Sequence, residues 1–319
     1  MDATSPKQAN AEALRPATLP TVDVIIATHN RPELLRIALD AVLNQTYEGK
    51  ITCYLVFDQS EPDMSLAQQG EHRDVVVTTN SERTPGLAGA RNTGILAGHG
   101  DYVAFCDDDD EWLPEKVALQ VDALTRTGQL TSVSGIIIVY SDHESMRIPT
   151  PEQMTLRELV RNRVMEAHPS TVMVRRDALV GPIGLVDEEI PGSYGEDFDW
   201  IIRAAEVGGF ALVPDALVRV RWGQSLFSSR WQTIVDAIDY MIAKHPVFLE
   251  SKKGLGRLYG RQSFALAALG RRQAALRKAF GAWKSNPRER RAYLGAAVAL
   301  RLLSARWVMD LAHKRGHGI

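Results

Sequence analysis

The chain has 319 residues, of which 45% are hydrophobic and 7% aromatic, and its formal net charge is −2. This composition is typical of a globular chain with a sizeable core, built as one large domain plus an appendage or as two domains. Two cysteines, Cys53 and Cys106, are too few for a disulfide framework, so we expect reduced core thiols in the cytoplasm. No run of 18 apolar residues occurs, which excludes a membrane-spanning helix.

Residues 1–20 are rich in alanine, threonine and proline and carry four charged side chains. They contain no uninterrupted apolar run, so we expect no signal peptide there. We predict that this segment is a disordered N-terminal tail.

Residues 21–141 alternate between strand patterns and helix patterns. Compact apolar runs predict strands, and runs with hydrophobic residues along one side predict helices. The expected strands cover 21–29, 51–58, 74–80, 102–106 and 131–141, and the expected helices lie within 31–47, 86–100 and 114–127. Asn30 and Glu33 have the spacing of a capping box at the start of the first helix. This order predicts an α/β fold with a mostly parallel sheet between helices.

After residue 141 the pattern loosens and then becomes helical. The expected helices cover 155–165 and 196–208, the expected strands cover 170–176 and 210–222, and a long loop covers 179–195. Within the last strand, Pro214 and Asp215 predict a turn. Beyond residue 229 only helical patterns remain, and two amphipathic segments flank a turn at Gly270, like one hairpin of a helical repeat.

Four consecutive aspartates, Asp107 to Asp110, directly follow the predicted strand at 102–106. Carboxylates packed this closely repel one another, and a bound cation relieves the repulsion. Oxygen ligands suit Mg²⁺ or Mn²⁺, which proteins often hold together with substrate phosphates. Because open α/β sheets bind ligands at the carboxyl ends of their strands, the run predicts a metal that holds a diphosphate. The alternative is a solvated acidic turn, and the spacing of an EF-hand is absent.

Other candidate ligand-binding groups also follow predicted strands. Residues 27–31 and Asp58 lie at the carboxyl ends of the first two strands, where backbone groups and an acid can bind a nucleoside. Asp58 could equally be a turn residue. Gly86 and Gly89 permit close approach of the backbone, and Arg91 could contact a phosphate or pair with a neighbouring carboxylate.

Glu196 and Asp197 begin a predicted helix. Acids at a helix N-terminus interact favourably with the helix dipole, which is a sufficient structural reason for either residue. The functional interpretation is a general base that takes a proton from an acceptor hydroxyl. His29 and His168 fit structural histidines better than metal ligands.

The ordered segments VIIATHNRPELL, LVFDQS, GLAGARNTGILAGHGDYVAFCDDDDEWLPEK and GEDFDW resemble an inverting family-2 glycosyltransferase over residues 22–225. The resemblance implies the GT-A nucleotide-diphospho-sugar transferase fold, a Rossmann-like mixed sheet between helices, here with an all-helical C-terminal extension. It also implies a sugar donor activated by a nucleoside diphosphate, often UDP, and Mg²⁺ or Mn²⁺ held by an Asp-x-Asp motif.

The resemblance assigns roles to matching positions of this chain. Asp107 and Asp109 become the metal ligands, with Asp109 the direct one, and Asp197 becomes the catalytic base. The implied donor-binding residues are Thr28, Asn30, Arg31, Asp58, Arg91, Asp107 and Asp108. Of these, Asp58 matches the acid that binds the pyrimidine.

Two positions depart from the family pattern. Similar enzymes often have Asp-Asp-Gly-Ser after the second strand, whereas this chain has Phe-Asp-Gln-Ser at 57–60. Related chains often place a histidine ligand near the last strand, where this chain has Arg221 and Trp222. The acid of the first motif is retained, and the histidine of the second is not.

The small net charge hides a division between two parts of the chain. Residues 1–250 carry 21 Lys and Arg against 37 Asp and Glu, whereas residues 251–319 carry 16 against 2. We therefore expect a glycosyltransferase domain at 21–228 and a basic helical module at 229–319. Two interpretations of the module stay open: peripheral docking on an anionic membrane surface, or packing on the acidic domain or into a homodimer interface. Without a recognised binding motif, the charge does not predict a nucleic-acid partner.

The sequence thus predicts a metal-dependent inverting glycosyltransferase that moves a sugar from a nucleotide-sugar donor, expected to be a UDP-sugar, to an acceptor hydroxyl. The expected acceptor is a glycan or a lipid-linked sugar in cell-envelope or extracellular glycan synthesis. The expected location is the cytoplasm, at the inner face of the plasma membrane. The alternative is a catalytically inactive scaffold that binds a sugar nucleotide and is recruited through its basic C-terminal helices.

Overall fold

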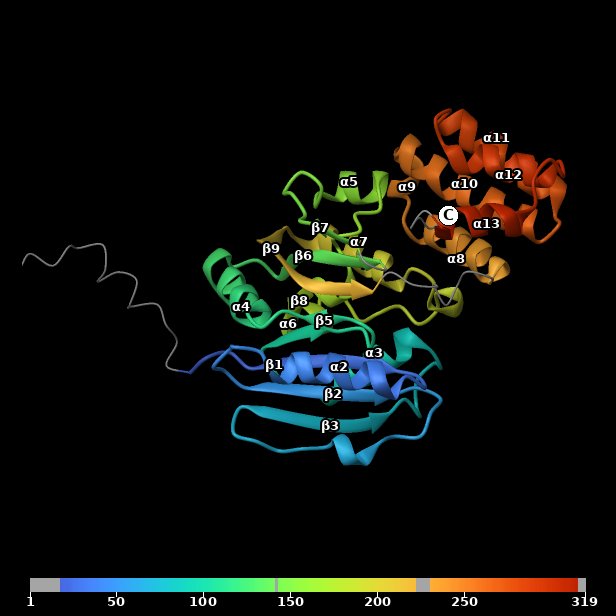
Figure 1. Cartoon of the computed structure of the whole chain (residues 1–319). Coiled ribbons are helices and arrows are strands. Elements are labelled where there is room, and N and C mark those ends of the chain that lie inside the picture. Colours follow the sequence, from blue (N-terminus) through green and yellow to red (C-terminus); the bar gives the residue numbers. More distant parts are fainter. Residues whose placement is uncertain (1–17, 141–142, 222–229, 315–319) are drawn as a thin grey trace, which may run out of the picture.

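The computed structural model describes residues 18–140, 143–221 and 230–314. Most of the predicted N-terminal tail, and Trp222 near the last strand, lie outside the described residues. The first strands and the C-terminal helices occupy opposite ends of the molecule in Figure 1, with the second half of the sheet between them.

Among the described residues, one mixed sheet of nine strands forms the centre of the protein. Eight strands follow the order β3-β2-β1-β4-β8-β6-β9-β5, and β7 pairs with β6. The strands are β1 (Val22–Thr28), β2 (Ile51–Phe57), β3 (Arg73–Thr79), β4 (Tyr102–Phe105), β5 (Glu111–Trp112), β6 (Thr131–Tyr140), β7 (His143–Arg147), β8 (Val172–Arg175) and β9 (Phe210–Arg221). The first four are parallel to one another, whereas β8 lies antiparallel between β4 and β6. The sheet is therefore mixed, as the resemblance implies, and it is also mostly parallel, as the element order predicts, because most of its paired residues lie in parallel ladders.

Helices cover both faces of the sheet because the side chains of a strand alternate between its faces. In β1, Val24 and Ile26 are buried in one hydrophobic cluster, and Ile25 is buried in the cluster on the other face. The helices of this part are α2 (Pro32–Leu43), α3 (Leu87–Ala97), α4 (Lys116–Thr127), α5 (Leu156–Arg161), α6 (Arg176–Val180) and α7 (Glu196–Val207). The first cluster includes residues of α2 and α4, and the second includes residues of α3 and α7.

Two local predictions are wrong. Asn30 adopts left-handed backbone with φ of 54°, and α2 begins after Arg31 without a side-chain cap, so no capping box forms. The chain does not turn at Pro214 and Asp215. Instead, β9 continues through both residues, and a register shift against β6 absorbs them as a bulge.

The C-terminal part is helical, as predicted. It consists of α8 (Trp231–Lys244), α9 (Val247–Glu250), α10 (Lys252–Ala268), α11 (Arg272–Ser285), α12 (Arg290–Ala299) and α13 (Ala305–Lys314). The predicted hairpin is confirmed, since α10 and α11 flank Gly270, whose φ of 75° is easily reached only without a β-carbon. In the described ranges, every helix is too short or too polar to cross a lipid bilayer.

The C-terminal helices share a hydrophobic core with the sheet-containing part, beside which they lie in Figure 1. Ile202 of α7 is buried together with Ile238 of α8 and Phe264 of α10. In addition, the Asp199 carboxylate of α7 lies 2.8 Å from Nε2 of His245, which follows α8. These contacts agree with packing of the basic helices on the rest of the chain, and docking on a membrane stays a prediction.

Lys116, at the start of α4, is a fully buried amine. Its Nζ donates to Gln120 Oε1 (2.7 Å) and lies 3.7 Å from the centre of the Trp112 ring. Burial lowers the pKa of Lys116 from 10.5 to about 7. Between these two values the unfolded chain binds more protons than the folded one, so the free energy of unfolding rises with pH, by up to about 1.4 kcal/mol per pH unit.

We expect Lys116→Met to remove this rise, because methionine has a similar volume and does not titrate. Urea unfolding at several pH values from 7 to 10 measures the slope in the wild type and in the variant. Lys253→Met, which removes an exposed amine from α10, is the matched control and should keep the wild-type slope. Parallel slopes in the wild type and Lys116→Met would show that Lys116 remains protonated in the folded protein.

Candidate functional site

The segments that follow β1, β2 and β4 meet at one edge of the sheet. Thr28 and Phe57 are partners in the parallel ladder, and the next N–H, that of Asp58, donates to the Thr28 carbonyl oxygen (2.9 Å). On the other side of β1, the Cys106 N–H donates to the Ile25 carbonyl oxygen (3.0 Å). Parallel pairing therefore brings the segment after β1, Asp58 and the four aspartates together, as the sequence predicts.

The buried Asp58 carboxylate connects three segments of this edge. Its oxygens accept hydrogen bonds from Asn80 Nδ2 (2.8 Å), Gln59 Nε2 (2.9 Å) and the Gly86 N–H (3.0 Å). Gly86 has φ of 121°, a conformation that residues with a β-carbon rarely adopt. His29 Nδ1 lies 2.7 Å from the Asp58 carbonyl oxygen. Asp58 thus holds the segments around Asn80 and Gly86 in place. Its contact with a pyrimidine stays a prediction.

Thr28 and Arg31 hold the two middle aspartates of the run. Thr28 Oγ1 donates to Asp108 Oδ2 (2.8 Å), and Arg31 Nη1 donates to Asp108 Oδ1 (3.1 Å) and Asp109 Oδ2 (2.9 Å). Burial raises the pKa of both carboxyl groups above the ordinary value, although the Arg31 charge opposes it. Asn30 lies exposed beside this group.

Asp107 and Asp110, the first and last of the run, form a cluster with His168. One potential ligand atom from each residue lies within 4.8 Å of the other two. Ser170 Oγ links the two acids, because it accepts from the Asp107 N–H (2.9 Å) and donates to Asp110 Oδ2 (2.5 Å). Burial, together with the Asp107 charge, raises the pKa of Asp110 well above its ordinary value. Burial lowers the pKa of His168, which favours the neutral imidazole.

This cluster has the donor groups of a divalent-cation site. Two close carboxylates repel each other until a cation lies between them, and a neutral imidazole is a good nitrogen ligand. Two carboxylates and an imidazole suit Mn²⁺ better than Mg²⁺, which prefers oxygen ligands. The residues therefore fit the metal that the resemblance implies. Asp109, the ligand predicted from the sequence, faces Arg31, and its metal contact stays a prediction.

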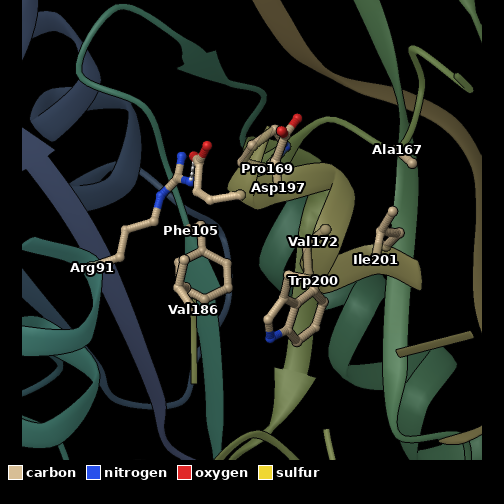
Figure 2. Close-up of a pocket in the computed structure, with 10 residues that line it drawn as sticks. Arg91, Phe105, Ala167, Pro169, Val172, Val186, Asp197, Trp200 and Ile201 are labelled. Atoms are coloured by element: carbon tan, nitrogen blue, oxygen red, sulfur yellow. Dashed lines mark hydrogen bonds and ion pairs between the residues drawn. The ribbon is translucent and has the colours of Figure 1, made fainter. Parts of the chain in front are cut away.

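Arg91 connects the aspartate run to the acidic pair at the start of α7. Its Nη2 donates to Asp107 Oδ1 (2.5 Å), and its Nη1 donates to Glu196 Oε1 (2.6 Å). Figure 2 shows the Arg91 side chain extending above Phe105 along a small pocket that Asp197 also lines. The sequence allows Arg91 to pair with a carboxylate or to contact a phosphate. The structure shows the pairing with carboxylates, and the phosphate contact stays a prediction.

Asp197 is the second residue of α7, and its Oδ2 accepts a hydrogen bond from Arg163 Nη2 (2.8 Å). Burial raises the pKa of Asp197, but the charges of Arg163 and Arg91 outweigh burial and hold it below its ordinary value. In contrast, burial raises the pKa of Glu196 to about 7, although Arg91 opposes it. Adjacent carboxyl groups with separated pKa values are typical of acid–base sites. Asp197 is therefore the ionised member, in the form that accepts a proton.

Four residues that contact this site had no assigned role in the sequence analysis: Arg163 and Ser170 were not singled out, Asp110 was only the last acid of the run, and a structural role was favoured for His168. For His168 and Ser170 the reason is the antiparallel pairing of β8 with β4, in which Met173 lies opposite Ala104. Residues that precede β8 consequently lie beside residues that follow β4. The segment His-Pro-Ser ahead of an apolar strand was visible in the sequence, but its strand partner was not.

Comparison with known proteins places the chain among sugar transferases. The family model described as glycosyl transferase family 2 matches residues 23–180, about half of the chain. A relative from Escherichia coli, UDP-Glc:alpha-D-GlcNAc-diphosphoundecaprenol beta-1,3-glucosyltransferase WfgD, is 27% identical over 44% of this chain and 55% of its own length. The putative teichuronic acid biosynthesis glycosyltransferase TuaG of Bacillus subtilis is 26% identical over 50% of this chain and 63% of its own length. The matches thus span less than two thirds of either relative.

Solved structures extend the similarity in fold to nearly the whole chain. TarS from S. aureus matches with a TM-score of 0.58 at 13% identity, over 93% of this chain and 92% of that chain. A mannosyltransferase from Pyrobaculum calidifontis, solved with GDP-Man and Mn²⁺, matches with a TM-score of 0.52 at 18% identity, over 95% and 88% of the two chains. At these identities the similarity concerns the fold.

Proposed function

Because the chain belongs to glycosyltransferase family 2 and has the GT-A fold, we propose that it transfers a sugar to an acceptor hydroxyl with inversion of the anomeric configuration. The proposed donor is a UDP-sugar, since TarS has also been solved with UDP and with UDP-GlcNAc. The proposed acceptor is a lipid-linked sugar or a glycan of the cell envelope. The names of WfgD and TuaG, which refer to a diphosphoundecaprenol-linked sugar and to teichuronic acid, support this class.

One observation carries the proposal: Arg91 joins Asp107 at the end of β4 to Glu196, which precedes Asp197. Sugar transfer needs one acidic group near the diphosphate and another near the acceptor hydroxyl. Here the buried Arg91 guanidinium fixes Asp107 relative to the helix that carries Asp197. That arrangement suits a reaction centre between a donor and an acceptor.

In the proposed mechanism, Asp197 takes the proton of the acceptor hydroxyl while that oxygen attacks the anomeric carbon from the face opposite the leaving group. Arg163 orients the carboxylate and keeps it ionised. One displacement from the opposite face inverts the configuration. General-base assistance of this kind contributes about 10²–10⁴ in rate.

The proposed donor site uses the segments after β1, β2 and β4. Thr28, Asn30, Arg31 and Asp58 would surround the nucleoside, and Asp108 would contact the ribose or the sugar. The proposed metal ligands are Asp107 with Asp110 and His168, or Asp107 with Asp109 as the sequence predicts. A bound Mn²⁺ or Mg²⁺ supplies positive charge against the negative charge that develops on the departing diphosphate.

The competing function is an inactive scaffold that binds a sugar nucleotide. Such a protein would not need an ionised carboxylate at Asp197 or an arginine that orients it. The basic C-terminal helices are compatible with both functions, since they could recruit a scaffold or bring an active enzyme to an anionic membrane surface. Activity, rather than location, therefore distinguishes them.

The test is a donor panel with the full-length protein. UDP-, GDP- and dTDP-sugars are first screened by thermal shift with Mn²⁺ or with EDTA, and the donors that stabilise the protein are then assayed for hydrolysis. We expect one UDP-sugar to stabilise the protein and to be hydrolysed slowly in Mn²⁺ but not in EDTA. Binding without any hydrolysis or transfer would favour the scaffold. If none of the nucleotide sugars binds, both functions are contradicted.

A further inference from the structure

Four arginines converge beside Asp197, three of them from the C-terminal helices. Arg257 and Arg261 lie four residues apart on α10 and so project from the same side of the helix. Arg291 of α12 packs against the α10 backbone between them, where a β-carbon at Gly260 would lie 3.3 Å from Arg291 Cβ. Arg163, the fourth, pairs with Asp197. We call Arg163, Arg257, Arg261 and Arg291 the arginine cluster.

The aromatic neighbours of Asp197 position the two arginines of α10. The Arg257 guanidinium carbon lies 5.2 Å from the centre of the Phe198 ring, and that of Arg261 lies 5.3 Å from the centre of the Tyr194 ring. Phe198 directly follows Asp197 in the sequence, and Tyr194 precedes it by three residues. The cluster is therefore next to the carboxylate proposed to activate the acceptor.

The cluster contains more positive charge than the described residues neutralise. Asp197 pairs with Arg163 and Glu289 pairs with Arg291 (3.4 Å), whereas Arg257 and Arg261 have no ion pair within the described ranges. Burial, followed by the charges of the other arginines, lowers the pKa of Arg257 to about 9. Arginine is rarely left in such surroundings, because it is nearly always charged and like charges repel.

The hydrogen-bond donors of the cluster are also unused. In the part of the chain that the structure describes, four buried nitrogens have no acceptor: Nε and Nη2 of Arg257, Nε of Arg261 and Nε of Arg291. Buried polar groups are normally hydrogen-bonded, and a guanidinium presents its donors in a planar fork that matches phosphate oxygens. Stacking on aromatic rings accounts for the position of the arginines but leaves these donors without partners.

We propose that the arginine cluster binds a phosphate group of the acceptor and so places the acceptor hydroxyl at Asp197. The proposal rests on the proposed function, whose acceptor class it narrows to phosphate-bearing sugars, with the phosphate as a monoester, diester or diphosphate. A phosphate supplies the negative charge and the oxygen acceptors that the cluster lacks. The cluster borders solvent at two of its members, since 36% of the Arg163 side chain and 34% of the Arg291 side chain are exposed.

This site is separate from the one proposed for the donor diphosphate. The donor site consists of segments after β1, β2 and β4, whereas the cluster consists of α10, α12 and the segment after α5. Asp197 lies between the two, which is the position a group must have to act on an acceptor while the donor is bound. The acceptor phosphate would then be the ligand of the basic residues in the C-terminal helices.

The test is calorimetric titration of glucose 1-phosphate into the full-length protein, with saturating UDP and Mn²⁺ so that the donor site is filled. We expect glucose 1-phosphate to bind and glucose not to bind. Arg257→Gln and Arg261→Gln should each weaken binding about tenfold or more, because each removes a charged donor. Arg277→Gln, which removes an exposed arginine of α11, is the matched control and should bind as the wild type does.

Two further arms keep the outcomes separate. Flotation with phosphatidylglycerol vesicles should give equal binding for the wild type and the Arg257→Gln/Arg261→Gln double variant. If the double variant loses vesicle binding while glucose 1-phosphate fails to bind any form, the cluster is a membrane contact and the proposal is overturned. Equal affinity for glucose and glucose 1-phosphate would also overturn it. UDP affinity, measured first in the same cell, tests the proposed function independently, and a protein that binds no UDP can still be titrated with the sugar phosphate.

Discussion

Asp197→Asn is expected to slow sugar transfer by about 10²–10⁴, the usual contribution of a general base, while UDP affinity stays within about twofold. Asparagine has the shape of aspartate but cannot take the acceptor proton. Because Arg163 and Arg91 hold the pKa of Asp197 below its ordinary value, the wild-type carboxylate stays ionised through neutral pH. Wild-type activity should therefore decline only at acidic pH, and the variant should lose that acidic limb.

The measurement is a transfer assay at saturating donor, combined with calorimetric titration of UDP in Mn²⁺. Normal UDP binding by the variant shows that the site has folded, so a lost rate then reports on chemistry. Asp122→Asn, at an exposed position of α4, is the matched control and should transfer sugar at the wild-type rate. A rate within threefold of the wild type for Asp197→Asn would require another base.

Asp110→Asn is expected to stabilise the metal-free protein and to abolish its stabilisation by Mn²⁺. Burial and the Asp107 charge raise the pKa of Asp110 well above 3.8, so the folded state binds this proton more tightly than the unfolded chain does. The free energy of unfolding therefore falls as the pH rises from the pKa of Asp110 in the unfolded chain towards its higher pKa in the folded protein. Asparagine does not titrate, so the variant does not lose this stability. The Ser170 hydroxyl, which donates to Asp110 Oδ2, can still donate to an amide oxygen.

Thermal unfolding in EDTA and in Mn²⁺ measures both effects. At a concentration of 100 times its Kd, a metal that binds only the folded wild type adds about 2.7 kcal/mol to its stability. In EDTA at pH 7 the variant should melt a few degrees above the wild type, and in Mn²⁺ it should melt below it. Donor binding in Mn²⁺ should weaken in the same variant.

Asp109→Asn distinguishes the two proposed sets of metal ligands. If Asp107, Asp110 and His168 hold the metal, this variant keeps the Mn²⁺ stabilisation, because Asp109 faces Arg31. If Asp109→Asn loses the stabilisation and Asp110→Asn keeps it, the Asp-x-Asp pair predicted from the sequence is correct. A loss in neither variant would contradict a metal site at the end of β4.

The sequence predicts the half of the site that depends on parallel strands. Thr28, Asp58 and Asp107 each lie at or just after the end of an apolar run, and neighbouring parallel strands bring such ends to one edge whatever the length of the connecting helices. The residues involved are local to their strands. Strand patterns and turn residues are therefore enough to bring them together.

The other half depends on pairings that no local pattern specifies. Ser170 and His168 join the aspartates only because β8 inserts antiparallel between β4 and β6, and short strands such as β8 carry no signal for their partners. Similarly, the charge count reveals an excess of arginine after residue 250 but not its position. Arg257 and Arg261 lie near Asp197 because α7 and α10 contribute to one hydrophobic core and the two arginines contact the rings of Phe198 and Tyr194.

That shared core also limits how this enzyme can change during evolution. Ile202 and Phe198 come from the same helix as Asp197, and they pack on Ile238 and Phe248 of the C-terminal helices. A lineage could not exchange those helices for another accessory module without exposing the apolar side of the helix that carries the base. Variation in acceptor choice would therefore arise from substitutions on the surface of α10 and α12, with the buried sides of both helices retained.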